Sequence, residues 1–269
     1  MVGQRKIDSL LVYGAIYLVF IYAPVLLVVL FSFNDGLYVA FPLKGFTIKW
    51  YEEMVANTGL TKALMTSLKI ATLVSIVSTI FGVLAAKAVT RYYLPGRAPI
   101  TFTIMLPLVI PTIIFAIALL TILTKILGEQ PSTWSVIAGH ILLCVPFSMA
   151  VMISRLQGFD KNLEEASLDL GENGWQTFWR VTFPLAMPGI VASFLLCFTT
   201  SFDEYLLAAF LSGNDTTLPV YIFSQLRFPA KLPGTLALGS CILVISFVIV
   251  TFAEWLRRRG VNPDQGMGI

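Results

Sequence analysis

Long apolar runs separated by short polar segments dominate this sequence. A helix that crosses a bilayer needs about 20 mostly apolar residues, and six stretches reach that length with few charged positions. Strands of a membrane barrel would instead be segments of about 10 residues that alternate with period two. The pattern therefore predicts six transmembrane helices, at roughly 9–33, 64–88, 99–125, 133–155, 183–211 and 234–256.

We expect these helices to form a single transmembrane domain, residues 1–269, in an all-α membrane protein. Proline is tolerated in membrane helices when neighbouring groups satisfy the freed carbonyls. Prolines inside the predicted spans therefore indicate either kinks that shape a bundle or broken helices that line a pathway, and the sequence leaves both open. They are Pro24, Pro107, Pro111, Pro146 and Pro188.

Composition agrees with a lipid membrane location. Hydrophobic residues make up 57% of the chain and charged residues 12%, whereas about a quarter of a soluble domain is charged. The net charge of +3 is too small to indicate a nucleic-acid partner. Cys144, Cys197 and Cys241 lie in apolar runs without metal-binding or redox spacing, so we expect no metal site and only packing roles for them.

The distribution of Lys and Arg predicts the orientation, because cytoplasmic loops carry an excess of both. With the amino terminus inside, eleven of the 18 Lys and Arg residues fall on the cytoplasmic side, from Arg5 and Lys6 to the triplet Arg257–Arg259. We therefore expect a multi-pass protein with both termini in the cytoplasm. On the outer side, Trp50 and Tyr51 favour the membrane interface and predict a short helix there.

The predicted cytoplasmic segment 157–182 has the pattern of a helical hairpin. Asn162 and Glu165 have capping-box spacing, and Gly171 stands where a first helix would end, since glycine adopts the left-handed cap readily. A second short helix is predicted from Trp175 toward Val181. We expect apolar packing contacts from Leu163, Ala166, Leu168 and Leu170, and an exposed acidic face made of Glu164, Glu165, Asp169 and Glu172. Such a hairpin suits insertion into a groove on another protein.

Two adjacent acids, Asp203 and Glu204, fall in or near the fifth predicted span. Intramembrane carboxylates are costly and usually face a cavity or a partner group. One interpretation is a pathway for a cation, helped by the rings of Phe198, Phe202 and Tyr205. The other is a structural pair that holds a broken fifth helix or bonds to a partner subunit. His140, the single histidine, is interpreted as a hydrogen-bonded core residue.

Residues of the hairpin resemble the EAA signature of ABC-importer permeases. In that family Glu-Ala-Ala is followed after three residues by Gly, and after nine more by Ile-x-Leu-Pro. Here the matching positions are Glu165-Ala166-Ser167, Gly171 and Val181-Thr182-Phe183-Pro184, with three mild departures. Further stretches are similar to the spermidine/putrescine-type permeases, namely Tyr22–Pro24, Phe31–Asn34, Gly45–Tyr51 and Ser201–Glu204.

The resemblance implies a type I ABC importer permease fold in the bacterial cytoplasmic (inner) membrane, with a cytoplasmic coupling-helix hairpin. It implies a second homologous permease subunit, two copies of a cytoplasmic ATPase and an extracytoplasmic solute-binding protein as partners. ATP and Mg would be bound by the ATPase, and no cofactor or catalytic residue is expected on this chain. The coupling residues would be Glu164, Glu165, Ala166, Ser167, Leu170 and Gly171.

The cargo implied is a small organic solute, with a polyamine or related amine as the leading candidate and opines, amino-acid-like solutes or ions as others. The sequence lacks the Gly-x-x-x-x-Gly-Lys-Ser/Thr loop that binds nucleotide phosphates, so the chain would be the channel rather than the motor. The alternative is a stand-alone ion-coupled carrier. An intramembrane enzyme is disfavoured because no Ser/His, paired-Asp or zinc-ligand constellation lies within the spans.

Overall fold

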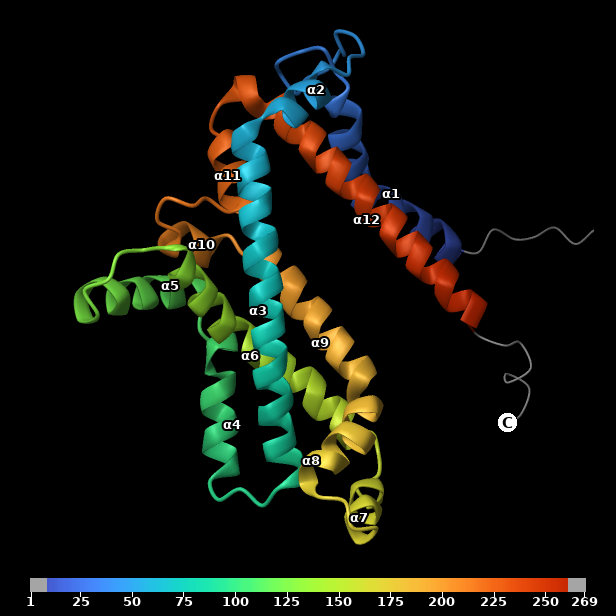
Figure 1. Cartoon of the computed structure of the whole chain (residues 1–269). Helices are drawn as coiled ribbons and strands as arrows, with labels where there is room; N and C mark the ends of the chain where they lie inside the picture. Colours follow the sequence, from blue (N-terminus) through green and yellow to red (C-terminus); the bar gives the residue numbers. More distant parts are fainter. Residues whose placement is uncertain (1–8, 261–269) are drawn as a thin grey trace, which may run out of the picture. The chain divides into compact units, whose positions relative to one another are not determined.

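The computed structural model describes residues 9–260, with side chains for 10–248 and for 251. All regular elements in this part of the chain are helices (Figure 1). Arg5 and Lys6, which supported the predicted orientation, lie outside the described residues, and so do the side chains of Arg257–Arg259. The five single helices that are long and apolar enough to cross a membrane are Leu10–Ser32, Thr58–Arg91, Thr133–Gln157, Gly174–Asp203 and Pro229–Val248.

The chain divides into two compact units, one made of residues up to 58 and from 222, the other of residues 59–221. The first unit contains α1 (Ser9–Ser32), α2 (Lys49–Ala56), η4 (Pro229–Lys231) and α12 (Leu232–Gly260). The second contains α3 (Thr58–Arg91), α4 (Arg97–Met105), η1 (Leu106–Leu108), α5 (Thr112–Thr121), η2 (Ile122–Ile126), α6 (Thr133–Gln157), α7 (Asn162–Asp169), α8 (Gly174–Thr177), η3 (Phe178–Thr182), α9 (Phe183–Asp203), α10 (Leu206–Leu211) and the first half of α11 (Leu218–Gln225).

In the first unit, side chains of α2 connect α1 to α12. The Trp50 ring is buried, and its Nε1 donates a hydrogen bond to the Asn34 carbonyl at 2.8 Å. The Tyr51 hydroxyl lies 2.6 Å from Ser32 Oγ and donates to Ser240 Oγ at 3.3 Å. The short helix predicted around these aromatic residues is therefore present, and its rings hold the end of α1 in place.

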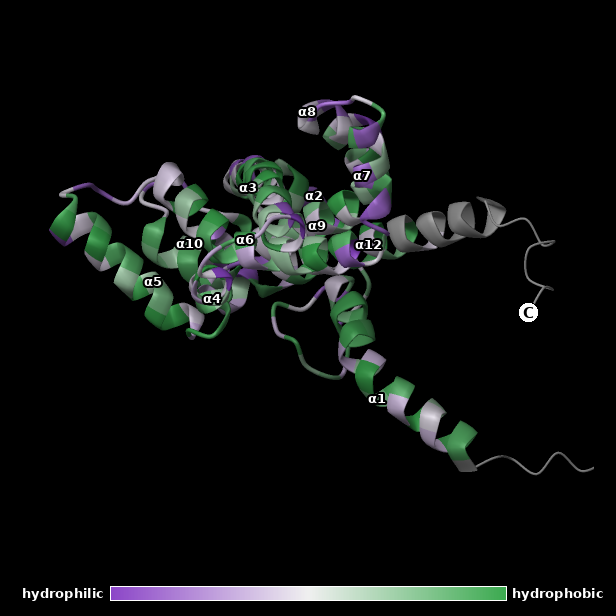
Figure 2. Ribbon diagram, turned by 90° about the horizontal axis from the view of Figure 1, so that it is seen from below, coloured by the Kyte–Doolittle hydropathy of each residue, from purple (hydrophilic) through white to green (hydrophobic). Residues whose placement is uncertain are grey.

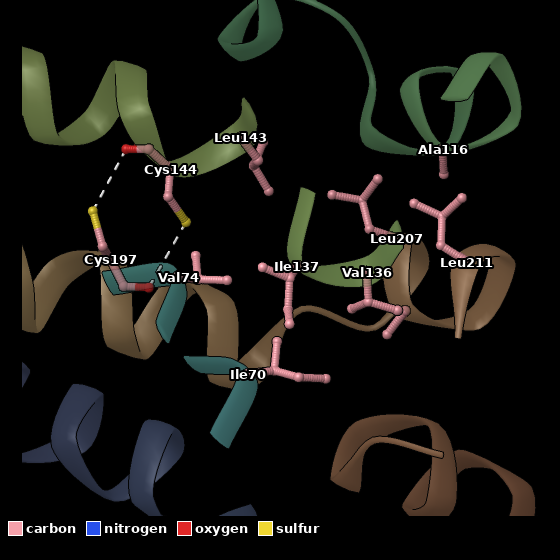
Figure 3. Close-up of a cluster of buried hydrophobic side chains, with 11 residues drawn as sticks. Ile70, Val74, Ala116, Val136, Ile137, Leu143, Cys144, Cys197, Leu207 and Leu211 are labelled. Carbon is pink, nitrogen blue, oxygen red and sulfur yellow. Dashed lines mark hydrogen bonds between the residues drawn. The ribbon is translucent and has the colours of Figure 1, made fainter. Parts of the chain in front are cut away.

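The core of the second unit lies where α6 meets α3, α9 and α10, and Figure 3 shows these side chains converging. Cys144 and Cys197 form a reciprocal pair of hydrogen bonds between α6 and α9. The Cys144 thiol donates to the Cys197 carbonyl at 3.7 Å, and the Cys197 thiol donates to the Cys144 carbonyl at 3.5 Å. These thiols act as small apolar groups with a weak donor. The buried members of the cluster are Ile70, Val74, Ala116, Val136, Ile137, Leu143, Cys144, Cys197, Leu207, Ala208 and Leu211.

Close approach of α3 to α6 depends on Gly82. A Cβ at this position would overlap the Ser148 side chain and lie 2.9 Å from the Met149 amide nitrogen. We expect Gly82→Ala to destabilise the protein by about 1–3 kcal/mol, as overpacking of a close-packed core does. Thermal unfolding in detergent measures the effect, and Gly14→Ala is the control because no atom lies within 4 Å of its added Cβ. Equal melting temperatures for the two variants would contradict the expectation.

The segment 99–125, predicted as one continuous span, is not one straight helix. Its two halves, Arg97–Leu108 and Thr112–Ile126, are bent by 100° at a short break, and α5 turns sharply away from the direction of α4 (Figure 1). The break falls at Pro111, whose ψ of 130° is extended and which has no N–H to continue the helix. Pro107 lies in η1 directly before the break. The prolines at 24, 146 and 188 lie inside continuous helices.

The fifth predicted span, 183–211, differs from the structure at both ends. Helix begins earlier, at Gly174, because α8, η3 and α9 form one stretch of 30 residues. The prediction of a separate short helix from Trp175 to Val181 is therefore wrong, because these residues belong to the helical stretch that continues to Asp203. The helix ends at Asp203, before α10 begins.

Candidate functional site

The first helix of the hairpin, α7, begins one turn after α6 ends. Asp160 accepts hydrogen bonds from the Asn162 backbone N–H at 3.0 Å and from its side-chain amide at 3.1 Å. The capping box expected between Asn162 and Glu165 is absent from the described hydrogen bonds, since Lys161 takes the N-cap position without a side-chain bond. The carboxylate of Asp160 stabilises the start of the helix instead, as acids near a helix N-terminus do.

Gly171 ends α7 in the left-handed conformation, with φ of +91°. The Glu172 N–H bonds to the Ser167 carbonyl at 3.2 Å, and the Gly171 N–H bonds to the Leu168 carbonyl at 2.9 Å. These two bonds are those of a Schellman motif, so the predicted glycine corner is present. No atom lies within 4 Å of a Cβ built on Gly171. Backbone conformation, rather than space, is what requires glycine here.

The second arm of the hairpin begins with a capping box. Asn173 Oδ1 accepts from the Gln176 N–H at 2.9 Å, and Gln176 Oε1 accepts from the Asn173 N–H at 2.9 Å. The two arms are joined by a buried bond of 3.0 Å between the hydroxyls of Ser167 and Thr177. Ser167, which replaces alanine in the family signature, therefore fixes the angle between the arms.

Glu164 does not lie on the exposed face predicted for it. Its side chain is 13% exposed, and its Oε2 lies 3.4 Å from Nε of Arg91, which is 6% exposed. Its Oε1 accepts a bond from Thr182 Oγ1 at 2.7 Å. The carboxylate thus connects α7 both to the end of α3 and to η3. Adjacent positions on a helix point about 100° apart, so Glu164 is mostly buried while Glu165 is exposed.

Arg91 is a residue of this site that the sequence did not single out. Its Nη2 donates to the Leu156 carbonyl at 2.8 Å and to the Phe159 carbonyl at 3.4 Å. The guanidinium also lies over the Phe159 ring, 4.7 Å from its centroid. Because it satisfies carbonyls at the end of α6 while facing Glu164, Arg91 holds the base of the hairpin. In the sequence, the position of Arg91 at the end of a long apolar run was the signal that could have pointed to this role.

The hairpin exposes an acidic and apolar surface. Glu165, Ala166 and Asp169 are exposed, whereas Glu172 is mostly covered and accepts a bond from Arg180. The leucines expected to pack inward are exposed as well, and polar residues mark α7 and α8 in Figure 2. We call the following exposed residues the hairpin surface: Leu163, Glu165, Ala166, Leu168, Asp169, Leu170 and Trp175. Leu170 is 86% exposed, and the several exposed apolar side chains of the hairpin surface are of the kind that interaction sites group together.

At the opposite end of α9, three phenylalanine rings stack along one helix face. The ring centroids of Phe194 and Phe198 are 6.4 Å apart, and those of Phe198 and Phe202 are 6.0 Å apart with planes within 12°. The spacing of four residues places the rings on one face. Asp203 follows directly and is exposed, and within the described residues it has no hydrogen bond or ion pair.

Glu204 has a structural contact of its own. Its Oε1 accepts from the backbone N–H groups of Leu206 at 2.8 Å and Leu207 at 3.2 Å, at the first turn of α10. This geometry matches the alternative in which an acid holds a broken fifth helix. The Glu204 carboxylate is therefore hydrogen-bonded to the backbone, whereas the Asp203 carboxylate is unengaged. Tyr205 lies between them and α10 and is partly buried.

His140 lies in the interior of the second unit. Its Nδ1 is 2.9 Å from Ser201 Oγ, and only 1% of the residue is exposed. The prediction of a hydrogen-bonded core histidine agrees with this contact between α6 and α9. Ser201 belongs to one of the stretches similar to the polyamine-type permeases, and its role here is to bond α9 to α6 two residues before Asp203.

Comparison with known proteins shows extended similarity. Residues 78–260 match the family described as "Binding-protein-dependent transport system inner membrane component". The spermidine/putrescine transport system permease protein PotC of Escherichia coli K12 is 34% identical over 253 residues, which cover 94% of both chains. The putrescine transport system permease protein PotI of the same strain is 33% identical over 243 residues, 88% of this chain and 85% of that one.

A solved structure is similar as well. It is a chain of the bacterial alginate ABC transporter in complex with alginate pentasaccharide-bound periplasmic protein. The likeness has a TM-score of 0.72 and covers 93% of both chains, at 19% sequence identity. At this identity the likeness concerns the fold alone, and it confirms the fold class predicted from the sequence.

Proposed function

Since this chain belongs to the family of inner membrane components of binding-protein-dependent transport systems, we propose that it carries a polyamine or a related small amine as the permease subunit of an ABC importer. The observation that carries the choice of cargo is the unengaged carboxylate of Asp203 beside the stacked rings of Phe198 and Phe202. A carboxylate and aromatic faces are the groups that attract ammonium ions. The names of the two polyamine permeases that it resembles point to the same cargo.

In this proposal the chain forms half of the pathway, and a second homologous permease forms the other half. Two copies of a cytoplasmic ATPase bind ATP and Mg, and a solute-binding protein delivers cargo from outside. The solute-bound periplasmic protein in the similar alginate transporter supports the last partner. Both termini would then be cytoplasmic, at the same side of the membrane as the hairpin.

The coupling route runs along one helix. The second arm of the hairpin continues through η3 into α9, so Gly174 and Asp203 are the ends of a single 30-residue stretch. At 1.5 Å per residue that stretch is about 45 Å long. The ATPase would hold the hairpin surface in a groove, with Glu165 and Asp169 toward basic residues. Its closure on ATP would then tilt the hairpin as a rigid body, and α9 would carry the motion to Asp203.

Roles within the hairpin divide between contact and support. Glu165, Ala166 and Leu170 would touch the ATPase, because they are exposed. Glu164, Ser167 and Gly171 would act by shaping the hairpin, through the bonds to Arg91 and Thr177 and the left-handed turn. The coupling function thus depends on both sets of residues.

Co-purification followed by transport tests the proposal. The tagged chain is extracted from its native membrane in mild detergent, and the proteins that accompany it are identified by mass spectrometry. We expect a P-loop ATPase and a second permease, and ATP-dependent uptake of labelled spermidine or putrescine once the complex and its binding protein are reconstituted in liposomes. A chain that emerges alone and moves solute without ATP would establish the alternative of a stand-alone ion-coupled carrier. An ATP-driven complex that ignores both amines would overturn the cargo alone.

Neutralising Asp203 is expected to weaken uptake selectively. A hydrogen bond to a charged group contributes about 1.5–3 kcal/mol, so Asp203→Asn should raise the KM for spermidine about tenfold or more. The measurement is ATP-dependent uptake into proteoliposomes at varied concentrations of spermidine, with a fixed amount of binding protein. Glu129→Gln removes the same charge at an exposed position outside this site and is expected to leave KM unchanged. An unchanged KM for Asp203→Asn would remove Asp203 from the pathway.

A further inference from the structure

A basic cavity opens at the base of the hairpin. Its volume is about 360 Å³, and it lies where the ends of α3 and α6 approach the starts of α4 and α7. Neither the fold nor the coupling route requires a hollow at this place. The residues that line it are Thr90, Arg91, Arg97, Gln157, Phe159, Asp160 and Lys161.

Two cations in the cavity are available to a ligand. Within the described part of the chain, the side chains of Arg97 and Lys161 have no hydrogen bond or ion pair. The third cation, Arg91, is engaged by carbonyls and Glu164, and the one acid, Asp160, is engaged by Asn162. The lining therefore presents two unpaired positive charges. Arg97 is also the first residue of α4, where the partial positive charge of a helix N-terminus adds to its own.

Helix α4, which supplies Arg97 to the cavity, also lines an apolar groove. The volume of the groove is about 300 Å³, and it is lined by Pro99, Ile100, Thr103 and Ile104 of α4. Arg97 lines the cavity and Pro99 lines the groove, and both residues belong to the first turn of α4. In the connection before α4, Tyr93 is 95% exposed, and tyrosine rings of this kind are typical of the level of lipid headgroups.

From this juxtaposition we propose that the cavity binds the phosphate headgroup of an anionic phospholipid of the cytoplasmic leaflet, with an acyl chain of the same lipid along the groove of α4. Basic pockets between helices on the cytoplasmic side of a membrane are suited to such headgroups. A soluble phosphate compound would use the cavity but leave the groove without an occupant. The choice of leaflet rests on the proposed cytoplasmic placement of the hairpin.

Lipid titration of the intact importer tests the site. The complex is purified in detergent and titrated with phosphatidylglycerol, phosphatidylcholine or inorganic phosphate, and bound lipid is counted by native mass spectrometry. We expect one phosphatidylglycerol per copy of this chain that resists exchange for phosphatidylcholine, and no displacement by millimolar phosphate. Displacement by phosphate, or equal retention of the two lipids, would overturn the proposal.

Removing the positive charges of the cavity tests whether the lipid binds there. The double variant Arg97→Gln/Lys161→Gln is expected to lower the affinity for phosphatidylglycerol about tenfold, which corresponds to about 1.4 kcal/mol. The control Lys125→Gln/Arg227→Gln removes two positive charges from exposed positions outside the cavity and should retain the lipid. Equal loss in both variants would overturn the site. The readout uses neither ATP nor amine, so its failure is distinguishable from failure of the proposed transport function.

Discussion

Gly171→Asp is expected to leave the protein folded and inserted but to uncouple ATP hydrolysis from uptake. The turn at this residue has φ of +91°, and a side chain in the left-handed region costs roughly 1–2 kcal/mol. Because nothing lies within 4 Å of the added Cβ, the penalty falls on the angle between the hairpin arms rather than on the core. The measurement is the ratio of cargo moved to ATP hydrolysed in proteoliposomes, which should fall about tenfold or more.

A matched control lies three residues further on. Gly174 also has open space around an added Cβ, but it is the first residue of α8, where an acid is favourable. Gly174→Asp should therefore keep the coupling ratio, and Gly171→Asn should lose less than Gly171→Asp, because asparagine tolerates the left-handed cap. If Gly171→Asp transported with a normal ratio, the hairpin angle would have no part in coupling.

Arg91→Met is expected to be among the most destabilising single changes in the second unit. It leaves the mostly buried carboxylate of Glu164 without its ionic partner, and breaking a buried pair in this way costs about 3–5 kcal/mol. It also frees the carbonyls of Leu156 and Phe159. Thermal unfolding of the purified chain, or the yield of folded protein where the variant is too unstable to purify, measures the loss.

The companion variants separate the ion pair from the other contacts. Glu164→Gln keeps an acceptor for Thr182 Oγ1 and should be milder than Arg91→Met. The double variant Arg91→Met/Glu164→Gln should recover part of the stability, because no unpaired charge remains buried. A double variant whose loss equals the sum of the two single losses would show that the two side chains do not interact.

Local signals in the sequence predicted the turn of the hairpin but not the directions of its side chains. Gly171 was identifiable because a helix that ends at glycine follows a local backbone rule. Which of the two acids Glu164 and Glu165 would be buried depends on where Arg91 lies, more than 70 residues away along the chain. The leucines of the hairpin have an apolar character that predicts packing, yet their side chains are exposed.

Breaks in the spans show the same division between local and tertiary causes. Hydropathy marked the segment 99–125 as apolar, but a bend of 100° leaves hydropathy unchanged. Of the five candidate prolines, Pro107 and Pro111 lie at this break. The other three lie inside continuous helices, because kinks depend on whether neighbours satisfy the freed carbonyls. Asp203 and Glu204 are adjacent and equally acidic, and only the start of α10 gives Glu204 a backbone partner.

The contact of α1 and α2 with α12 has a consequence for biosynthesis. The bond from Tyr51 to Ser240 joins residues 189 positions apart. At about 5–20 residues per second, a ribosome needs about 10–40 s to bridge that distance. During this interval α1 and α2 lack their contacts with α12, whereas helices of the second unit can associate as they emerge. Premature termination anywhere before α12 therefore leaves α1 and α2 without their contacts to α12. Exposed helices of this kind are substrates for the proteases that degrade newly inserted membrane proteins.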